Sequence, residues 1–327
     1  MKSEAGPPSR ESIADDGNQE ESVTVVVIAI CGLPQLARTL EALIQQEGAP
    51  SFDIVVAADP RLGDLQAIEH KFPTVTILAE PGRLTPIELS ATGLEAATGE
   101  RILLTEDSCL PDRNWVGELV RAPWRGHGAV GGVIEPGVSA SAAMWAFYYV
   151  DFFRYMRPAT AGATPTLSVC NVAYHRSHLE AIRELWKDGF HESEAHDALR
   201  KRFGPLYLCP TAEVRVRRNV RYSDAVYERY AFGRLFGATR VAHASAGRRL
   251  YYAAFSPALP ALLLTRMTTT AAKRRGTRVS FLKALPSLVT MVFAWSWGEW
   301  LGYLTERRAK RITTAPEIPE TTTSIDN

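Results

Sequence analysis

Two adjacent carboxylates, Glu106 and Asp107, follow a short apolar run that begins after Arg101. The run predicts a buried strand, so both acids stand at its carboxyl end. Like charges repel there and burial penalises each of them, so the pair is poorly placed for stability. A divalent cation and a phosphate group would compensate this charge. The pair is therefore either a ligand site or a solvated acidic turn. The neighbouring elements indicate which of the two interpretations applies.

Strands and helices alternate around this pair. Residues 23–30 are nearly all β-branched or apolar, which is typical of a strand covered on both faces. Residues 53–58 and 75–78 predict two more strands. Leucines at helical spacing follow the first strand as far as residue 46, and small residues over 86–98 predict a second helix. This order predicts an α/β fold with a mostly parallel sheet, which binds ligands at the carboxyl ends of its strands.

The turn after the first strand argues against a dinucleotide-binding domain. Such a domain needs three spaced glycines there, so that the backbone approaches the pyrophosphate closely. This turn offers only Gly32, followed by Pro34, and the sequence contains no P-loop lysine motif.

These residues resemble the inverting glycosyltransferases of family 2, which have the GT-A fold, a Rossmann-like sheet flanked by helices. The resemblance runs from about residue 23 to about residue 216. The family's second strand ends in acids that contact the nucleotide, and Asp59 stands at that place. Its fourth strand ends in the acidic DxD motif, matched by Glu106-Asp107-Ser108. The resemblance implies that Asp59, Glu106 and Asp107 bind a nucleotide sugar, and that the last two hold Mn²⁺ or Mg²⁺.

The second half of the chain continues the resemblance. Residues 168–176 look like the family strand that carries an asparagine beside the acceptor, which makes Asn171 a binding candidate. Residues 188–202 are similar to the turn and helix that carry the catalytic base, and Asp197 stands at that position. Processive relatives have an arginine box near residues 229–240, which implies a diphosphate contact by Arg234.

The expected chemistry needs these residue types. Displacement at the anomeric carbon builds charge on the leaving diphosphate, which a cation held by Glu106 and Asp107 neutralises. The acceptor hydroxyl loses its proton as it attacks, which calls for a carboxylate base. Asp197, placed at the start of a predicted helix, is kept ionised by the helix dipole and suits that role.

Two alternatives stay open. A GT-A-like nucleotidyltransferase shares this sheet but needs a basic, glycine-rich phosphate loop near the N-terminus. A non-catalytic relative acting as a membrane scaffold remains compatible with three departures from the family pattern, which are Ala58, Ser108 and His196.

The composition of the 327 residues limits the kinds of molecule that the protein is expected to bind. Basic and acidic residues number 37 and 36, so the chain has no bulk attraction to nucleic acid. The four cysteines lack metal-like spacing and are expected to be reduced core residues of an intracellular protein. The expected partners are a nucleoside-diphosphate sugar and a glycan, polysaccharide or lipid-linked acceptor.

We expect four parts along the chain. Residues 1–21 form a disordered tail, 22–245 the GT-A domain, 246–312 a membrane-associated helical region and 313–327 a flexible tail. The helical region contains two apolar blocks, at residues 251–264 and 284–304. A transmembrane helix needs about 20 apolar residues, and each of these blocks is either too short or interrupted.

Basic residues flank both blocks, and tryptophans stand in the second one. These features favour two helices lying in an anionic interface, at the cytoplasmic face of the cell membrane. The alternative is a helical pair that covers the catalytic domain.

Overall fold

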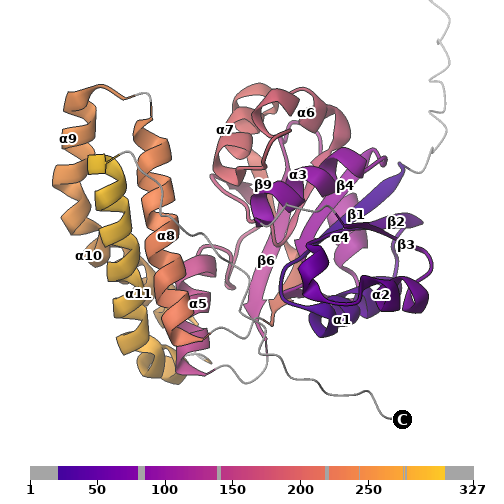
Figure 1. Ribbon diagram of the computed structural model, residues 1–327, viewed down its shortest axis with the longest axis horizontal. Coiled ribbons are helices and arrows are strands. Elements are labelled where there is room, and N and C mark those ends of the chain that lie inside the picture. The colour runs from indigo at the N-terminus through magenta and orange to yellow at the C-terminus, as the bar shows by residue number, and fades with distance from the viewer. Residues whose placement is uncertain are drawn as a thin grey trace, which may run out of the picture.

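The computed structural model describes residues 21–79, 85–137, 141–217, 221–242, 244–274, 276 and 278–305. Almost all of the predicted tail 1–21 and the whole of 313–327 lie outside these residues. The described part forms a sheet domain and, beside it, a layer of helices (Figure 1).

Within the described residues, nine strands form one mixed sheet in the order β3-β2-β1-β4-β8-β6-β9-β5, with β7 paired to β9. Strands β1 to β4 are mutually parallel where they pair, and β8 runs antiparallel to β4. The predicted α/β sheet with flanking helices is confirmed. The strands are β1 (Val23–Ala29), β2 (Phe52–Ala58), β3 (Val75–Ala79), β4 (Arg101–Glu106), β5 (Cys109–Pro111), β6 (Val130–Pro136), β7 (Gly162–Thr164), β8 (Val172–His175) and β9 (Leu206–Val216).

Helices cover both faces of this sheet, because alternate side chains of its central strands point to opposite sides. Val25 and Val27 of β1 join one apolar core, and Val26 and Ile28 join the other. The first core packs against α1 (Leu33–Ile44), α2 (Leu65–Lys71), α4 (Trp115–Arg121) and α5 (Ala142–Phe152). The second packs against α3 (Pro86–Ala96), α6 (Arg176–Glu180) and α7 (Glu192–Phe203).

The helical layer consists of α8 (Tyr222–Val241), α9 (Ala246–Phe255), α10 (Leu259–Lys273) and α11 (Arg278–Thr305). Its α8 and α11 lie against each other (Figure 1). Glycines make this contact close. A Cβ on Gly233 would lie 2.1 Å from the carbonyl oxygen of Trp295, and one on Gly298 would lie 2.1 Å from that of Tyr230. The predicted apolar block 251–264 is divided between α9 and α10, whereas 284–304 lies within α11.

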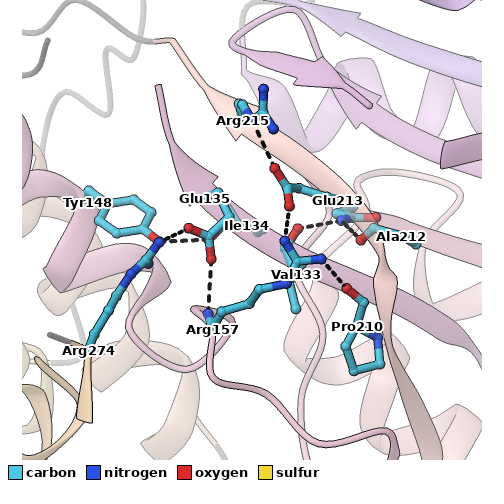
Figure 2. A network of polar contacts seen from close by, with 11 residues as sticks. Val133, Ile134, Glu135, Tyr148, Arg157, Pro210, Ala212, Glu213, Arg215 and Arg274 are labelled. Atoms are coloured by element: carbon cyan, nitrogen blue, oxygen red, sulfur yellow. Dashed lines mark hydrogen bonds and ion pairs between the residues drawn. The ribbon is translucent and has the colours of Figure 1, made fainter. Parts of the chain in front are cut away.

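A network of ion pairs attaches the helical layer to the sheet (Figure 2). Glu135 of β6 accepts hydrogen bonds from the backbone N–H of Arg157, at 3.0 Å, and from the guanidinium of Arg274, which follows α10. Glu213 of β9 accepts from Arg157 and, at 2.8 Å, from Arg215. Both carboxylates are buried, and the ion pair of Glu135 with Arg274 fixes the end of α10 to the carboxyl end of β6.

Candidate active site

The parallel register brings the predicted acids to one edge of the sheet. Ile28 of β1 lies opposite Glu106 of β4, and Ala29 lies opposite Ala58 of β2. Asp59 therefore follows the strand on one side of β1 and Glu106 ends the strand on the other. Two strand spacings separate those strands, about 10 Å. The turn after β1 lies between them, and this is the ligand-binding edge of an open α/β sheet.

Asp107 stabilises the turn after β1 by hydrogen bonds with its backbone. Its carboxylate is buried and both oxygens accept from the backbone N–H of Cys31, at 2.8 and 3.1 Å. Burial raises the pKa of Asp107 to about 7; hydrogen bonds from Cys31 and Ile30 oppose this rise, and the charge of Glu106 adds to it. These contacts give Asp107 a structural role at the turn and leave the half-buried Glu106 more open to a ligand. The expected cation and nucleotide contacts of Asp107 remain predictions.

Glu106 and Ser108 form a hydrogen-bonded pair in the acidic turn. Glu106 is half-buried and Ser108 is buried, and the Glu106 Oε2 accepts a hydrogen bond of 3.1 Å from the Ser108 hydroxyl. In the described part of the chain, no three His, Cys, Asp or Glu side chains are grouped so that they could hold a metal ion. Mg²⁺ commonly binds through one or two carboxylates plus substrate phosphates. The oxygens of Glu106 and Ser108 therefore fit a cation that arrives with a diphosphate, and they do not form a complete protein cage.

Asp59 caps the short 3-10 turn Pro60–Leu62 that follows β2. Its carboxylate accepts from the backbone N–H of Arg61 at 3.0 Å and from the Arg61 guanidinium at 2.8 Å. Burial acts to raise the pKa of Asp59, but the hydrogen bonds and charge of Arg61 outweigh it and leave the pKa below its ordinary value. Asp59 is thus a fixed, ionised hydrogen-bond acceptor at the edge.

Asn171 lies at the same edge, but both its amide oxygen and its amide nitrogen are hydrogen-bonded to other groups of the protein. Its Oδ1 accepts from Trp115 Nε1 at 2.8 Å, and its Nδ2 donates to the carbonyl oxygens of Val133, at 2.8 Å, and Ala212, at 3.0 Å. These bonds hold β6 to β9 where their register shifts, between Gly132 and Val133. The geometry therefore gives Asn171 a scaffold role, and the expected sugar contact remains a prediction.

The other two candidates lie apart from these acids. Asp197 was predicted at the start of a helix but lies in the middle of α7. It is half-buried, with 42% of its side chain exposed, and is paired with Arg200 at 2.6 Å and Lys201 at 2.5 Å. Hydrogen bonds from Lys201 and then Arg200 hold the pKa of Asp197 below its ordinary value. Arg234 lies on α8, where it donates to Thr305 of α11 at 3.0 Å, and α8 stands beyond β6 from β1 and β2 (Figure 1).

One residue that the sequence reasoning did not select lies close to the site. Glu192, the first residue of α7, is half-buried and accepts a hydrogen bond of 3.1 Å from the backbone N–H of Val169. Burial raises the pKa of Glu192 to about 7; the bond from Val169 opposes the rise, Glu106 adds to it and Arg154 lowers it. The available signal was an acid in the first helical turn, directly after Phe190 and His191.

With this geometry established, comparisons with known proteins define the class. Residues 20–219 match the family model described as glycosyltransferase like family 2, so the chain belongs to that family. The protein is a glycosyltransferase with a GT-A-type fold, as the resemblance implied. No curated protein sequence matches the chain.

Two solved structures are similar to this chain, and the first of them supports the fold. The mannosyltransferase PcManGT from Pyrobaculum calidifontis, in complex with GDP-Man and Mn²⁺, is similar with a TM-score of 0.56 and 18% identity, over 85% of this chain and 86% of that one. GalNAc-T7 with UDP, GalNAc and Mn²⁺ is similar with a TM-score of 0.45 and 16% identity, over 61% of this chain and 44% of that one. Both structures contain a nucleotide and Mn²⁺.

Proposed function

We propose that this protein transfers a sugar from a nucleoside-diphosphate sugar to a hydroxyl of a glycan or lipid-linked acceptor, with inversion at the anomeric carbon. The observation that carries the proposal is the gathering of Asp59, Glu106 and Asp107 around the turn after β1, in a chain whose family is glycosyltransferase.

Each acid has a distinct task in this proposal. Asp59 accepts a hydrogen bond from the nucleoside, because it is ionised and held rigidly by Arg61. Glu106 and Ser108 hold a divalent cation, Mn²⁺ or Mg²⁺, together with the donor diphosphate. When bound, the cation stabilises charge on the leaving diphosphate. Asp107 keeps the turn at Cys31 in place.

Calorimetry tests the donor site. GDP and UDP are titrated into the full chain with and without Mn²⁺, since GDP-Man and Mn²⁺ are found in the similar mannosyltransferase. We expect Mn²⁺ alone to bind weakly and one nucleotide to bind at least about tenfold more tightly with Mn²⁺ than without, because the protein supplies only part of the coordination shell. Failure of both nucleotides to bind contradicts the proposal. Binding without any donor turnover favours the scaffold alternative.

The helical layer supports a second part of the proposal, which is attachment to a membrane surface. In the described part of the chain, α11 alone is long and apolar enough to cross a membrane, and about a third of its most apolar window is buried. Its outward face carries Leu282, Phe293 and Trp297, each more than half exposed. Exposed basic residues stand on the same layer: Arg248, Arg266, Lys273, Arg278 and Lys283.

An apolar face bordered by cations suits the anionic, cytoplasmic face of a cell membrane, where apolar insertion and charge attraction act together. Sedimentation of the full chain with vesicles of mixed anionic and neutral lipid tests this. Phe293→Ser with Trp297→Ser should weaken vesicle binding at least about tenfold, because it removes two inserted aromatic side chains. Ile44→Ser with Leu185→Ser, which alters exposed apolar residues of the sheet domain, is the matched control. Equal binding by both double variants contradicts attachment through α11.

A further inference from the structure

Two acids of α7 point in different directions. A helix turns by about 100° per residue, so residues four apart share a face and residues five apart do not. Glu192 therefore shares a face with His196, which is buried and lies 2.8 Å from the hydroxyl of Tyr174 on β8. Asp197 follows one residue later, so it lies on a different side of the helix, where it is paired with Arg200 and Lys201. Glu192 is thus the acid of α7 that faces the sheet.

A short chain of contacts links Glu192 to the acidic turn. Its carboxylate accepts from the N–H of Val169, and the next residue, Cys170, accepts from the Thr105 hydroxyl at 2.8 Å. Thr105 directly precedes Glu106. The two half-buried carboxylates, Glu192 and Glu106, are therefore both tied to the segment 168–170 and its neighbour Thr105.

The charges around Glu192 come from several elements. Glu106 approaches from β4, Arg154 from the segment after α5, and the hydroxyls of Tyr155 and Tyr174 from that segment and β8. Burial outweighs the favourable Val169 hydrogen bond and brings the pKa of Glu192 to about 7. A base whose pKa lies near the working pH accepts protons efficiently. Asp197, whose pKa is lowered by two cations, is a weaker base.

We infer that Glu192, and not Asp197, is the catalytic base of the transfer reaction, an inference that rests on the proposed function. The acceptor oxygen forms a bond to the anomeric carbon, and the bond from that carbon to the diphosphate oxygen breaks with its electron pair leaving on the diphosphate. The proton of the acceptor hydroxyl passes to the Glu192 carboxylate. The Val169 N–H keeps that carboxylate oriented toward the segment beside Glu106.

Steady-state kinetics with GDP-mannose and UDP-glucose, in the presence of Mn²⁺ and with water as the acceptor, test the assignment. Glu192→Gln should lower kcat at least about 100-fold, the range expected for loss of a general base, with the donor KM unchanged. Glu194→Gln, which removes an exposed acid from the same helical turn, is the matched control and should keep kcat near the wild-type value. Asp197→Asn tests the alternative base directly.

Azide provides a second readout, because this anion attacks the anomeric carbon without a proton to remove. Glu192→Gln should form the glycosyl azide at the wild-type rate while its transfer to water is lost. An equal loss of transfer to azide and to water in Glu192→Gln would show that Glu192 has a structural role. A loss of transfer to water in Asp197→Asn alone would show that Asp197 is the base. Either result overturns the inference. A wild-type protein that turns over neither donor and binds neither GDP nor UDP with Mn²⁺ overturns the proposed function itself.

Discussion

Carboxylates beside the turn after β1 and in the helical layer are stabilised differently. Beside that turn, Asp107 and Glu192 accept hydrogen bonds from backbone N–H groups, those of Cys31 and Val169. In the helical layer, Glu299 of α11 accepts instead from side chains four residues away on either side, Trp295 at 2.9 Å and Tyr303.

The difference follows from where free backbone donors exist. Turns at strand ends have N–H groups that no ladder uses, whereas every N–H in the middle of a helix is bonded to a carbonyl one turn earlier. An acid inside a helix must therefore recruit side chains, as Asp151 of α5 does with Arg229 of α8. Such acids join helices to one another. Acids held by turns lie at an edge where a ligand also has access.

Packing differs between the two regions as well. The sheet is covered by large apolar side chains such as Leu36 and Leu40, which fill the space between layers. The contact of α8 with α11 instead depends on glycines that let two backbones approach. Close helix contacts through small residues are frequent where the outer helix surface is apolar. The helical layer should therefore be the more sensitive region to added volume.

Gly298→Val should have the largest effect on stability. Its added carbons meet the carbonyl oxygen of Tyr230, a backbone atom that cannot rotate away, and overpacking of this kind costs about 3 kcal/mol or more. Denaturant unfolding followed by circular dichroism measures the loss. Gly247→Ala, in a helix position with open space around it, should instead be neutral or stabilising by about 0.5–1 kcal/mol. Equal stability of both variants contradicts close packing of α8 on α11.

Asp107→Ala should have an intermediate effect. It leaves the N–H of Cys31 without its acceptor in a nearly enclosed turn, which costs about 1–3 kcal/mol. Asp107→Asn keeps one acceptor oxygen and should lose less. Because the turn also positions the donor, GDP affinity with Mn²⁺ should fall in step with stability across the two variants. If a destabilised Asp107→Ala protein keeps its full affinity for GDP with Mn²⁺, the turn does not position the donor.

Glu192→Gln should produce the smallest effect on stability, one that depends on pH. Burial raises the pKa of Glu192 from its ordinary value to about 7, so the charged form is disfavoured in the folded state. Near pH 4 both side chains are neutral and the two proteins should melt alike. As the pH rises from the ordinary pKa of a glutamate toward 7, the wild-type protein loses stability relative to the variant. Melting curves between pH 4 and 8 check this, and a constant difference at all pH values contradicts it.

The sequence determined much of the sheet and its ligand-binding edge. Residues 23–30, 53–58 and 75–78 predicted β1, β2 and β3 because an uninterrupted apolar run satisfies a strand covered on both faces. Acids at the ends of such runs are carried to the same edge by parallel register, so the sequence predicted that Asp59 and Glu106 lie at one edge of the sheet. Local pattern is sufficient here because chain direction alone places the residue that follows a strand.

Only the tertiary structure decided where the candidate side chains lie relative to one another. Asp107 turns inward because the N–H of Cys31 approaches it from a strand 76 residues earlier in the chain. Arg234 is drawn to α11 by the glycine contacts of α8, away from the sheet edge. The choice between Glu192 and Asp197 depends on how α7 is rotated against the sheet. That rotation is set by packing with distant strands, which the spacing of residues along α7 does not specify.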